Sequence, residues 1–389
     1  MNFAPLTAYL DSFLTEKNLP MVGCAVYYRH QPVYEHCAGF ANVERHIPMT
    51  RDTLFHLFSA SKAATVTAGL MLADRGLLDL NAPLSAYMPE FAHMTVRTEL
   101  GEGKEEIRRA ENPILVRHLF SMQAGLSYNT QTPEIAAVRE ATGGRCPTRE
   151  VVRAIAAAPL LFEPGTHFKY SMCHDVLGAL IEEVSGKRFG RFLQEELFAP
   201  LGMSDTAFYL SEEQMERLAP EYHGFDAATG KAKSVVLKNG MNMGMGPEYE
   251  SGGGGLSTSL ADYILLVETL ANRGLAPGGV RILKPETVDL LRRDWMDETS
   301  RHDFEAMGGW SKMGYSYGWG CAPSSTGSGT TPSAPTGNSA GTAPWAATGW
   351  RTRSGRWPSS TCSRQESPPG GSGTARCATR CTPAWANKR

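Results

Sequence analysis

The stretch "HLFSASKAATVTAGLMLADRG" (His56–Gly76) decides how the rest of the chain is interpreted. It contains the one S-x-x-K of the sequence, with Ser59 three residues before Lys62. The apolar residues that follow predict a helix from about Ser61 to about Asp74. Because helical residues three apart share one face, the hydroxyl and the amine are expected to lie close together.

This spacing has a catalytic and a structural interpretation. A serine hydroxyl is a poor nucleophile without a base beside it, and a lysine shielded between helices can accept a proton. The free N–H groups and the dipole at the helix N-terminus favour an oxyanion, so the pair can support acyl transfer. In the structural interpretation, Ser59 caps the helix and Lys62 is a solvated residue of its first turn.

The composition is that of an ordinary globular protein. The chain has 389 residues, of which 42% are hydrophobic and 20% charged, enough for a sizeable core. Its net charge of −2 gives no electrostatic reason to expect nucleic acid or an anionic membrane as a partner. Phe3, Leu6 and Leu10 predict an amphipathic first helix rather than a signal peptide, and no stretch approaches the length of a membrane span. We therefore expect a cytoplasmic protein, and the sequence leaves its oligomeric state open.

The eight cysteines form neither a disulfide framework nor a metal-binding pattern. Cys24, Cys37, Cys146 and Cys173 are scattered singly, and the other four follow residue 320. The chain contains no C-x-x-C and no H-E-x-x-H. We therefore predict free thiols, and we expect neither a metal nor a cofactor.

The order of the predicted elements indicates an α+β fold. Two β-rich runs, residues 21–30 and 32–41, predict a hairpin. Helical patterns follow, with no regular alternation of strands and helices, which argues against a doubly wound sheet. These patterns cover residues 114–123, 148–157, 174–184, 189–198 and 285–293, and a further helix is expected after the glycine-rich residues 251–255.

Longer stretches of the chain resemble the serine β-lactamase-like and penicillin-binding-protein-like family, which contains class C β-lactamases, D,D-peptidases and family VIII carboxylesterases. The resemblance runs in consistent order from about residue 5 to residue 320, and is far more specific than S-x-x-K alone. It is carried by "LFHLFSASKAATVTAGLMLADRGLLDLNAPLSAYMPEF" (54–91), "ILVRHLFSMQAGLSY" (114–128), "FEPGTHFKYSMCHDVLGALIEEVSGKRFGRFLQEELFAPLGMSDTAFY" (162–209) and "SGGGGLSTSLADY" (251–263).

The resemblance implies a β-lactamase/transpeptidase-like fold in two parts. Residues 1–75 and 255–320 are expected to form an antiparallel sheet flanked by helices. Residues 76–254 are expected to form an all-helical domain, with Ser59 in the cleft between the two parts.

The resemblance also implies the site residues and the reaction. Ser59 matches the family's nucleophile, Lys62 its partner, and Tyr170 in "KYSM" the tyrosine that shares general-base duty with the lysine. Met172 stands where β-lactamases have the asparagine of Y-x-N, and this departure favours simple esters over penicillins. We therefore predict a serine hydrolase, a carboxylesterase that forms an acyl-enzyme on Ser59 with a small-molecule ester substrate. A β-lactamase or D,D-peptidase acting on a β-lactam-like substrate is the alternative. His174 is interpreted as a surface histidine at a helix start rather than as a triad base.

The composition changes abruptly at Cys321. From there to Arg389 the chain has no Leu, Ile, Val, Phe, Met, Tyr or Asp, yet it holds four of the seven Trp and four of the eight Cys. Eight Lys and Arg stand against the single Glu366. A disordered basic tail is the ordinary interpretation, but its tryptophans and cysteines favour a frameshift of GC-rich DNA. Reading from the third base of each codon, the codons permitted by residues 337–363 can encode two apolar strand-like runs and a W-D-G tripeptide.

The third motif of the family, a K-T-G, H-x-G or W-x-G on a late strand, is expected after "GYSYGWG" (314–320), where the present frame does not supply it. Loss of that strand would remove one oxyanion donor, which is worth about 10²–10³ in rate. The alternative to an enzyme is therefore a protein that is catalytically inactive and poorly folded.

Resequencing of the gene across codons 310–389 tests this interpretation. We expect one additional base near codons 319–321, because its restoration encodes the W-D-G strand. If the present frame is the true one, the frameshift interpretation is wrong, and Ser59 and Lys62 belong to a chain without its third motif.

Overall fold

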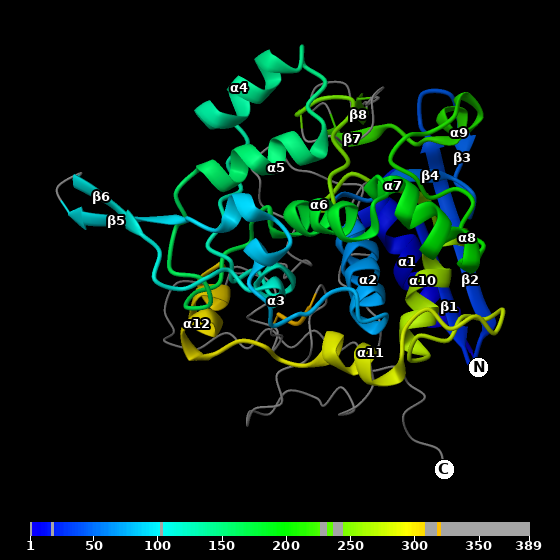
Figure 1. Cartoon of the computed structure of the whole chain (residues 1–389). Coiled ribbons are helices and arrows are strands. Elements are labelled where there is room, and N and C mark those ends of the chain that lie inside the picture. The colour runs from blue at the N-terminus through cyan, green and yellow to red at the C-terminus, as the bar shows by residue number, and fades with distance from the viewer. Residues whose placement is uncertain are drawn as a thin grey trace, which may run out of the picture.

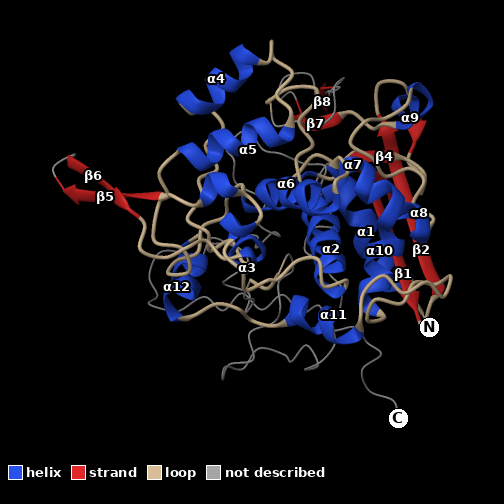
Figure 2. Cartoon of the chain, in the orientation of Figure 1, coloured by secondary structure: helices blue, strands red, loops and turns tan. Residues whose placement is uncertain are grey.

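The structure, a computed structural model, describes residues 2–16, 19–101, 104–225, 232–235, 244–307 and 317–319. Among these residues, antiparallel strands and helices succeed one another in the order of an α+β chain (Figures 1 and 2). The elements are α1 (Ala4–Glu16), β1 (Met21–Tyr28), β2 (Gln31–Asn42), β3 (Ile47–Pro48), β4 (Leu54–His56), the turns η1 (Phe58–Ala60), η2 (Leu84–Ala86) and η3 (Pro89–Phe91), α2 (Ser61–Asp74), β5 (Thr95–Gly101), β6 (Lys104–Arg109), α3 (Val116–Phe120), α4 (Pro133–Ala141), α5 (Thr148–Ala157), α6 (Cys173–Ser185), α7 (Phe189–Phe192), the π-helical η4 (Leu193–Phe198), α8 (Ala199–Leu201), α9 (Glu212–Arg217), β7 (Glu221–Phe225), β8 (Ala232–Val235), β9 (Ser257–Ser259), α10 (Leu260–Ala271), α11 (Pro285–Arg292) and α12 (Glu298–Ala306).

The predicted hairpin near the N-terminus is confirmed. β1 and β2 pair antiparallel, and the short β3 extends them to a three-stranded sheet within the described residues. The tight turn between β1 and β2 places Arg29 and His30 at φ values of 51° and 64°, as a two-residue hairpin turn with the right-handed strand twist requires. α1 and α10 both pack against β1.

A second strand pair joins two segments that are far apart in the sequence. β4 pairs antiparallel with β9, which sets His56 opposite Ser257, 201 positions away. The backbone N–H of Leu57 continues the contact by donating to the Leu256 carbonyl at 2.8 Å. This pairing lays the residues just before α2 alongside the glycine-rich segment 251–255.

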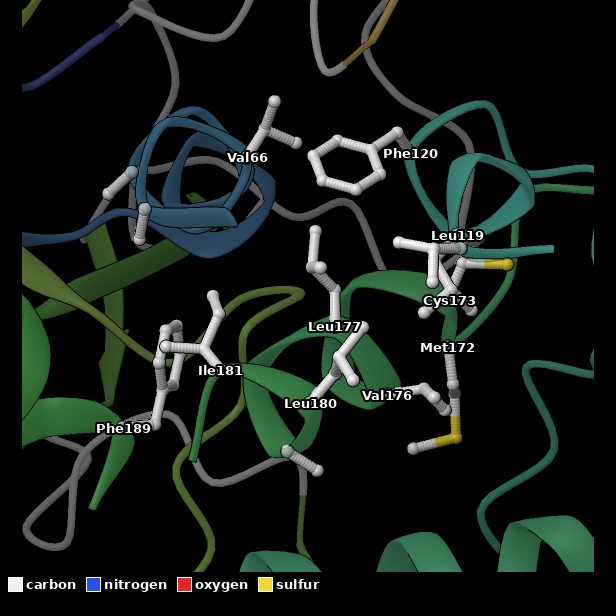
Figure 3. Close-up of a cluster of buried hydrophobic side chains, with 14 of the residues drawn as sticks. Val66, Leu119, Phe120, Met172, Cys173, Val176, Leu177, Leu180, Ile181 and Phe189 are labelled. Carbon is white, nitrogen blue, oxygen red and sulfur yellow. The ribbon is translucent and has the colours of Figure 1, made fainter. Parts of the chain in front are cut away.

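The helical core is built around the contact between α2 and α6. Figure 3 shows Val66 of α2 and Leu177 of α6 facing the ring of Phe120, the last residue of α3, in the same cluster. Gly69 permits this close approach, because a Cβ there would lie 2.8 Å from the Phe120 ring and 3.2 Å from Leu177. All three of the packed side chains are buried.

Most predicted helices are confirmed. α2 runs from Ser61 to Asp74, as its apolar pattern predicts, and α5 covers residues 148–157. The helix expected over 114–123 is shorter, because Met122 adopts a left-handed φ of 60° that ends the helical path. Helices are also present at the positions expected for 174–184, 189–198, 285–293 and the segment after the glycine run.

The stretch 76–254 contains strands as well as helices, although the resemblance predicted helices alone. β5 and β6 form a hairpin that projects from the body of the molecule (Figure 1), and β7 pairs with β8. Polar and charged residues predominate in β5 and β6, and neither strand shows a regular apolar alternation, so hydrophobic periodicity does not predict them.

The last described residues pack into the core. Trp319 stacks on Trp295 with ring centroids 4.3 Å apart and an angle of 6°, and its side chain is only 2% exposed. Residues 321–389 lie outside the described residues, so the frameshift interpretation stays a prediction. No helix in the described part of the chain is long and apolar enough to cross a membrane.

Truncation of Leu177 tests the α2–α6 core. We expect Leu177→Ala to lower the free energy of unfolding by about 2–5 kcal/mol, because it removes a fully buried side chain and leaves a cavity. Urea unfolding measures this change. The control is Leu77→Ala, at a leucine that is 52% exposed, where the change should stay within about 0.5 kcal/mol. An equal decrease in the free energy of unfolding for the two variants would contradict the burial of Leu177 between α2 and α6.

Candidate active site

Ser59 is the middle residue of the 3-10 turn η1. This turn ends at Ala60, directly before the first residue of α2. The residue before Ser59, Phe58, has a φ of 48°, a left-handed conformation that costs a phenylalanine about 1–3 kcal/mol and is concentrated at functional sites. The N-cap of α2 is Ala60, which makes no side-chain capping hydrogen bond. The structural interpretation of Ser59 as the helix cap is therefore wrong.

Lys62 is fully buried in the first turn of α2, so its interpretation as a solvated residue is also wrong. Its Nζ donates to Ser59 Oγ at 3.4 Å and also to the backbone carbonyl of Gly253. Burial lowers the pKa of the Lys62 amine, and the weaker influences of Tyr128 and Asp175 oppose that shift. The neutral amine, which can accept a proton, is thereby favoured relative to an exposed lysine.

Tyr170 reaches the same serine from the loop that precedes α6. Its hydroxyl donates to Ser59 Oγ at 2.7 Å, and Lys62 Nζ lies 4.7 Å from the centre of its ring. The ring stacks on Tyr128, with centroids 5.8 Å apart. Desolvation raises the pKa of the Tyr170 phenol, the hydrogen bond to Ser59 opposes the rise, and the negative charge of Asp175 adds to it. Tyr170 is therefore a proton donor at rest.

The structure thus brings the three predicted site residues together. Ser59 Oγ accepts hydrogen bonds from both Tyr170 and Lys62. An alcohol held between an amine of lowered pKa and a phenol of raised pKa can lose its proton to the amine. The phenol keeps its own proton and can donate it as an acid. The arrangement is suited to nucleophilic acyl transfer.

The backbone at the start of α2 is the position from which the family resemblance predicts one oxyanion donor. The N–H of Ser59 lies at the N-terminal end of that helix, where the dipole favours negative charge. The second donor was expected from a strand after residues 314–320, and the positions after 319 lie outside the described residues.

His174 is not at the surface, which corrects the prediction made for it. It is fully buried in the first turn of α6, where desolvation and then the nearby Lys62 lower its pKa to about 3. The prediction failed because a polar residue at the start of a helix is usually exposed, whereas the fold packs the start of α6 against the glycine-rich segment 251–255. A Cβ on Gly252 would lie 2.2 Å from the His174 carbonyl oxygen.

Met172, which replaces the asparagine of Y-x-N, is only 1% exposed. Its side chain packs beside Val176 in the hydrophobic cluster of Figure 3. The site therefore has no side-chain amide from this position.

Sequence reasoning missed a buried polar group on α6, close behind Lys62. Asp175 is fully buried, and its Oδ1 accepts hydrogen bonds from Tyr249 Oη at 2.9 Å and Ser251 Oγ at 2.6 Å. An acidic residue five positions after the tyrosine of the motif, within an otherwise apolar helix, was the feature that could have revealed it.

Comparison with known proteins agrees with this geometry. The beta-lactamase family profile matches residues 6–354. The chain belongs to the beta-lactamase family. Esterase EstB of Burkholderia gladioli is 31% identical to it over 319 residues, which cover 75% of this chain and 74% of EstB. Protein Rv1367c of Mycobacterium tuberculosis is 31% identical over 280 residues, 71% of this chain and 68% of that protein.

A solved structure gives the same result for this member of the beta-lactamase family. EstCE1, described as a hydrolase with promiscuous acyltransferase activity, is 28% identical and superposes with a TM-score of 0.62 over 81% of each chain. The α+β, β-lactamase/transpeptidase-like fold expected from the sequence is confirmed, and the protein is a serine hydrolase of that fold.

The buried amine predicts a characteristic pH dependence of stability. Because the folded-state pKa of Lys62 lies below its ordinary value of 10.5, the unfolded chain binds more protons between these two values. The free energy of unfolding of the wild type should therefore rise with pH in that window, and Lys62→Met should lack this rise. Urea unfolding at a series of neutral to alkaline pH values measures the two slopes.

The matched control is Lys169→Met, at an exposed lysine one residue before Tyr170. It should keep the wild-type slope. Identical slopes for wild type and Lys62→Met would show that the amine is not titrated differently by folding.

Proposed function

We propose that this member of the beta-lactamase family hydrolyses carboxylic esters of small molecules through an acyl-enzyme on Ser59. The observation that carries the proposal is the double hydrogen bond to Ser59 Oγ, from Tyr170 at 2.7 Å and from Lys62 at 3.4 Å. A serine in this setting has both the base and the acid that ester cleavage requires.

The first half of the reaction forms the acyl-enzyme. The neutral Lys62 amine takes the proton of Ser59 Oγ, which attacks the ester carbonyl carbon. The oxyanion that forms accepts a hydrogen bond from the Ser59 backbone N–H. As the bond to the alcohol breaks, Tyr170 gives its proton to the leaving oxygen and recovers one from the lysine ammonium, so the net proton moves from serine to alcohol.

The second half repeats these transfers with water. Water loses a proton to the Lys62–Tyr170 pair and attacks the acyl carbonyl, and Ser59 regains its proton as the acid leaves. An alcohol acceptor in place of water would give acyl transfer instead of hydrolysis. The similarity to EstCE1, a hydrolase with promiscuous acyltransferase activity, supports this extension.

Ester substrates are favoured over β-lactams on two grounds. The buried Met172 supplies no amide to hold an amide side chain of a substrate. The similarity to EstB, whose name describes an esterase, points the same way. Because the chain belongs to the beta-lactamase family, β-lactam hydrolysis should be tested alongside ester hydrolysis.

We further propose that the site lies between two parts of the chain, residues 1–75 with 255–320 and residues 76–254. The support is that Ser59 and Lys62 come from the first part, while Tyr170 and Gly253 come from the second.

Active-site variants test the proposed reaction. We expect the wild type to hydrolyse p-nitrophenyl butyrate in preference to nitrocefin and to show a covalent acyl adduct by intact mass. Ser59→Ala should lose both the activity and the adduct. Tyr170→Phe should lower kcat/KM by about 10²–10⁴, the range for loss of a general acid–base group.

The control for the tyrosine is Tyr209→Phe, at a tyrosine that is 49% exposed, which should retain wild-type kinetics. Hydrolysis of nitrocefin without hydrolysis of the ester would replace the proposal by a β-lactamase. Absence of any adduct on the wild-type serine would favour the non-catalytic alternative.

A further inference from the structure

Asp175 is a buried acidic group that the proposed reaction does not use. It occupies the third position of α6, and its side chain is fully buried. Its Oδ1 accepts hydrogen bonds from Tyr249 and Ser251, whereas its equally buried Oδ2 has no hydrogen-bond partner among the described residues. Leaving a buried carboxylate oxygen without a donor is costly, so a compensating interaction is expected nearby.

The free oxygen faces the catalytic lysine across Gly253. A Cβ built on Gly253 would lie 2.5 Å from Asp175 Oδ2 and 3.4 Å from Lys62 Nζ. The two charged atoms therefore lie within about 6 Å of each other, close enough for an opposite charge to favour the ammonium. Only a residue without a side chain fits between them.

The same carboxylate fixes the segment that holds the lysine. Tyr249 and Ser251, which donate to Oδ1, lie just before Gly253, whose carbonyl accepts from Lys62 Nζ. Asp175 thus acts on the lysine in two ways, through its charge and through the backbone that it holds in place.

The groups around Lys62 offer no other carboxylate among the residues that the structure describes. Ser59 and the stacked rings of Tyr170 and Tyr128 are neighbours of the amine, and the Cys173 thiol and the His174 ring come with Asp175 from the start of α6. Burial raises the pKa of the Cys173 thiol to about 11 and lowers that of His174 to about 3, so both are uncharged at neutral pH.

We propose that Asp175 is a positioning residue of this site, which holds the Gly253 carbonyl on Lys62 and supplies the buried counter-charge of the lysine ammonium. The inference rests on the proposed function, because it concerns the proton that Lys62 takes from Ser59. Removal of the carboxylate should have two effects, one on the pKa of Lys62 and one on the rate of attack by Ser59. Without the carboxylate, Lys62 loses its proton at lower pH, and the ammonium that develops during attack is less stable.

The test is the pH dependence of Ser59 modification in the full chain. The pseudo-first-order rate of labelling by a fluorophosphonate probe is measured against pH for wild type and Asp175→Asn, a substitution that keeps an acceptor for Tyr249 and Ser251. We expect the acidic limb of the profile to shift to lower pH by about one unit or more, and the limiting rate at high pH to fall about tenfold or more.

The matched control is Asp262→Asn. Asp262 is also a buried aspartate at the third position of a helix, α10, and it accepts from the Asp205 N–H and the Thr206 hydroxyl instead of facing the site. It should leave both the midpoint and the limiting rate as in the wild type. A merely structural role of Asp175 would lower the rate at every pH without moving the midpoint.

A second variant covers the case in which Asp175→Asn does not fold. Gly253→Ala places a methyl group between the carboxylate and the ammonium, and should move the acidic limb in the same direction. An unchanged midpoint in a folded Asp175→Asn, or in Gly253→Ala if only that variant folds, would overturn the inference. Failure of the proposed function is distinct: the wild type would then not be labelled at any pH, or Ser59→Ala would be labelled equally.

Discussion

Burial of one lysine amine is the constraint on which this structure depends. Lys62 is fully buried in the first turn of α2, where an ammonium is costly and a free amine is favoured. That placement needs a carbonyl acceptor, a serine three residues earlier and a tyrosine from another part of the chain. The packing of α2 against α6 and the pairing of β4 with β9 supply these partners. The stability of the fold and the reactivity of the site are therefore set by the same contacts.

The local parts of this arrangement could be predicted from the sequence. The S-x-x-K spacing, the apolar run of α2 and the β-rich runs of the N-terminal hairpin depend on residues close in the chain, and each is present where it was expected. Tyr170 was found by its likeness to a motif of the family, since a tyrosine before a helix has no distinctive pattern of its own.

The remainder depends on contacts that no local pattern specifies. The surroundings of Asp175 arise because Tyr249, Ser251 and Gly253 return to α6 after more than seventy residues. His174 was misplaced for the same reason, since its burial comes from the glycine segment laid over it. The polar β5–β6 hairpin was missed because its strands lack an apolar face.

The β4–β9 pairing also has a consequence for how the chain folds. It joins residues 201 positions apart, so Ser59 is synthesised long before the strand that aligns the glycine segment with it. Contacts of such sequence separation form slowly, because the chain must close a long loop before they are made. During synthesis Ser59 and Lys62 therefore emerge long before the Gly253 carbonyl that accepts a hydrogen bond from the lysine, so the full set of contacts around Lys62 can form only after the second half of the chain has been translated.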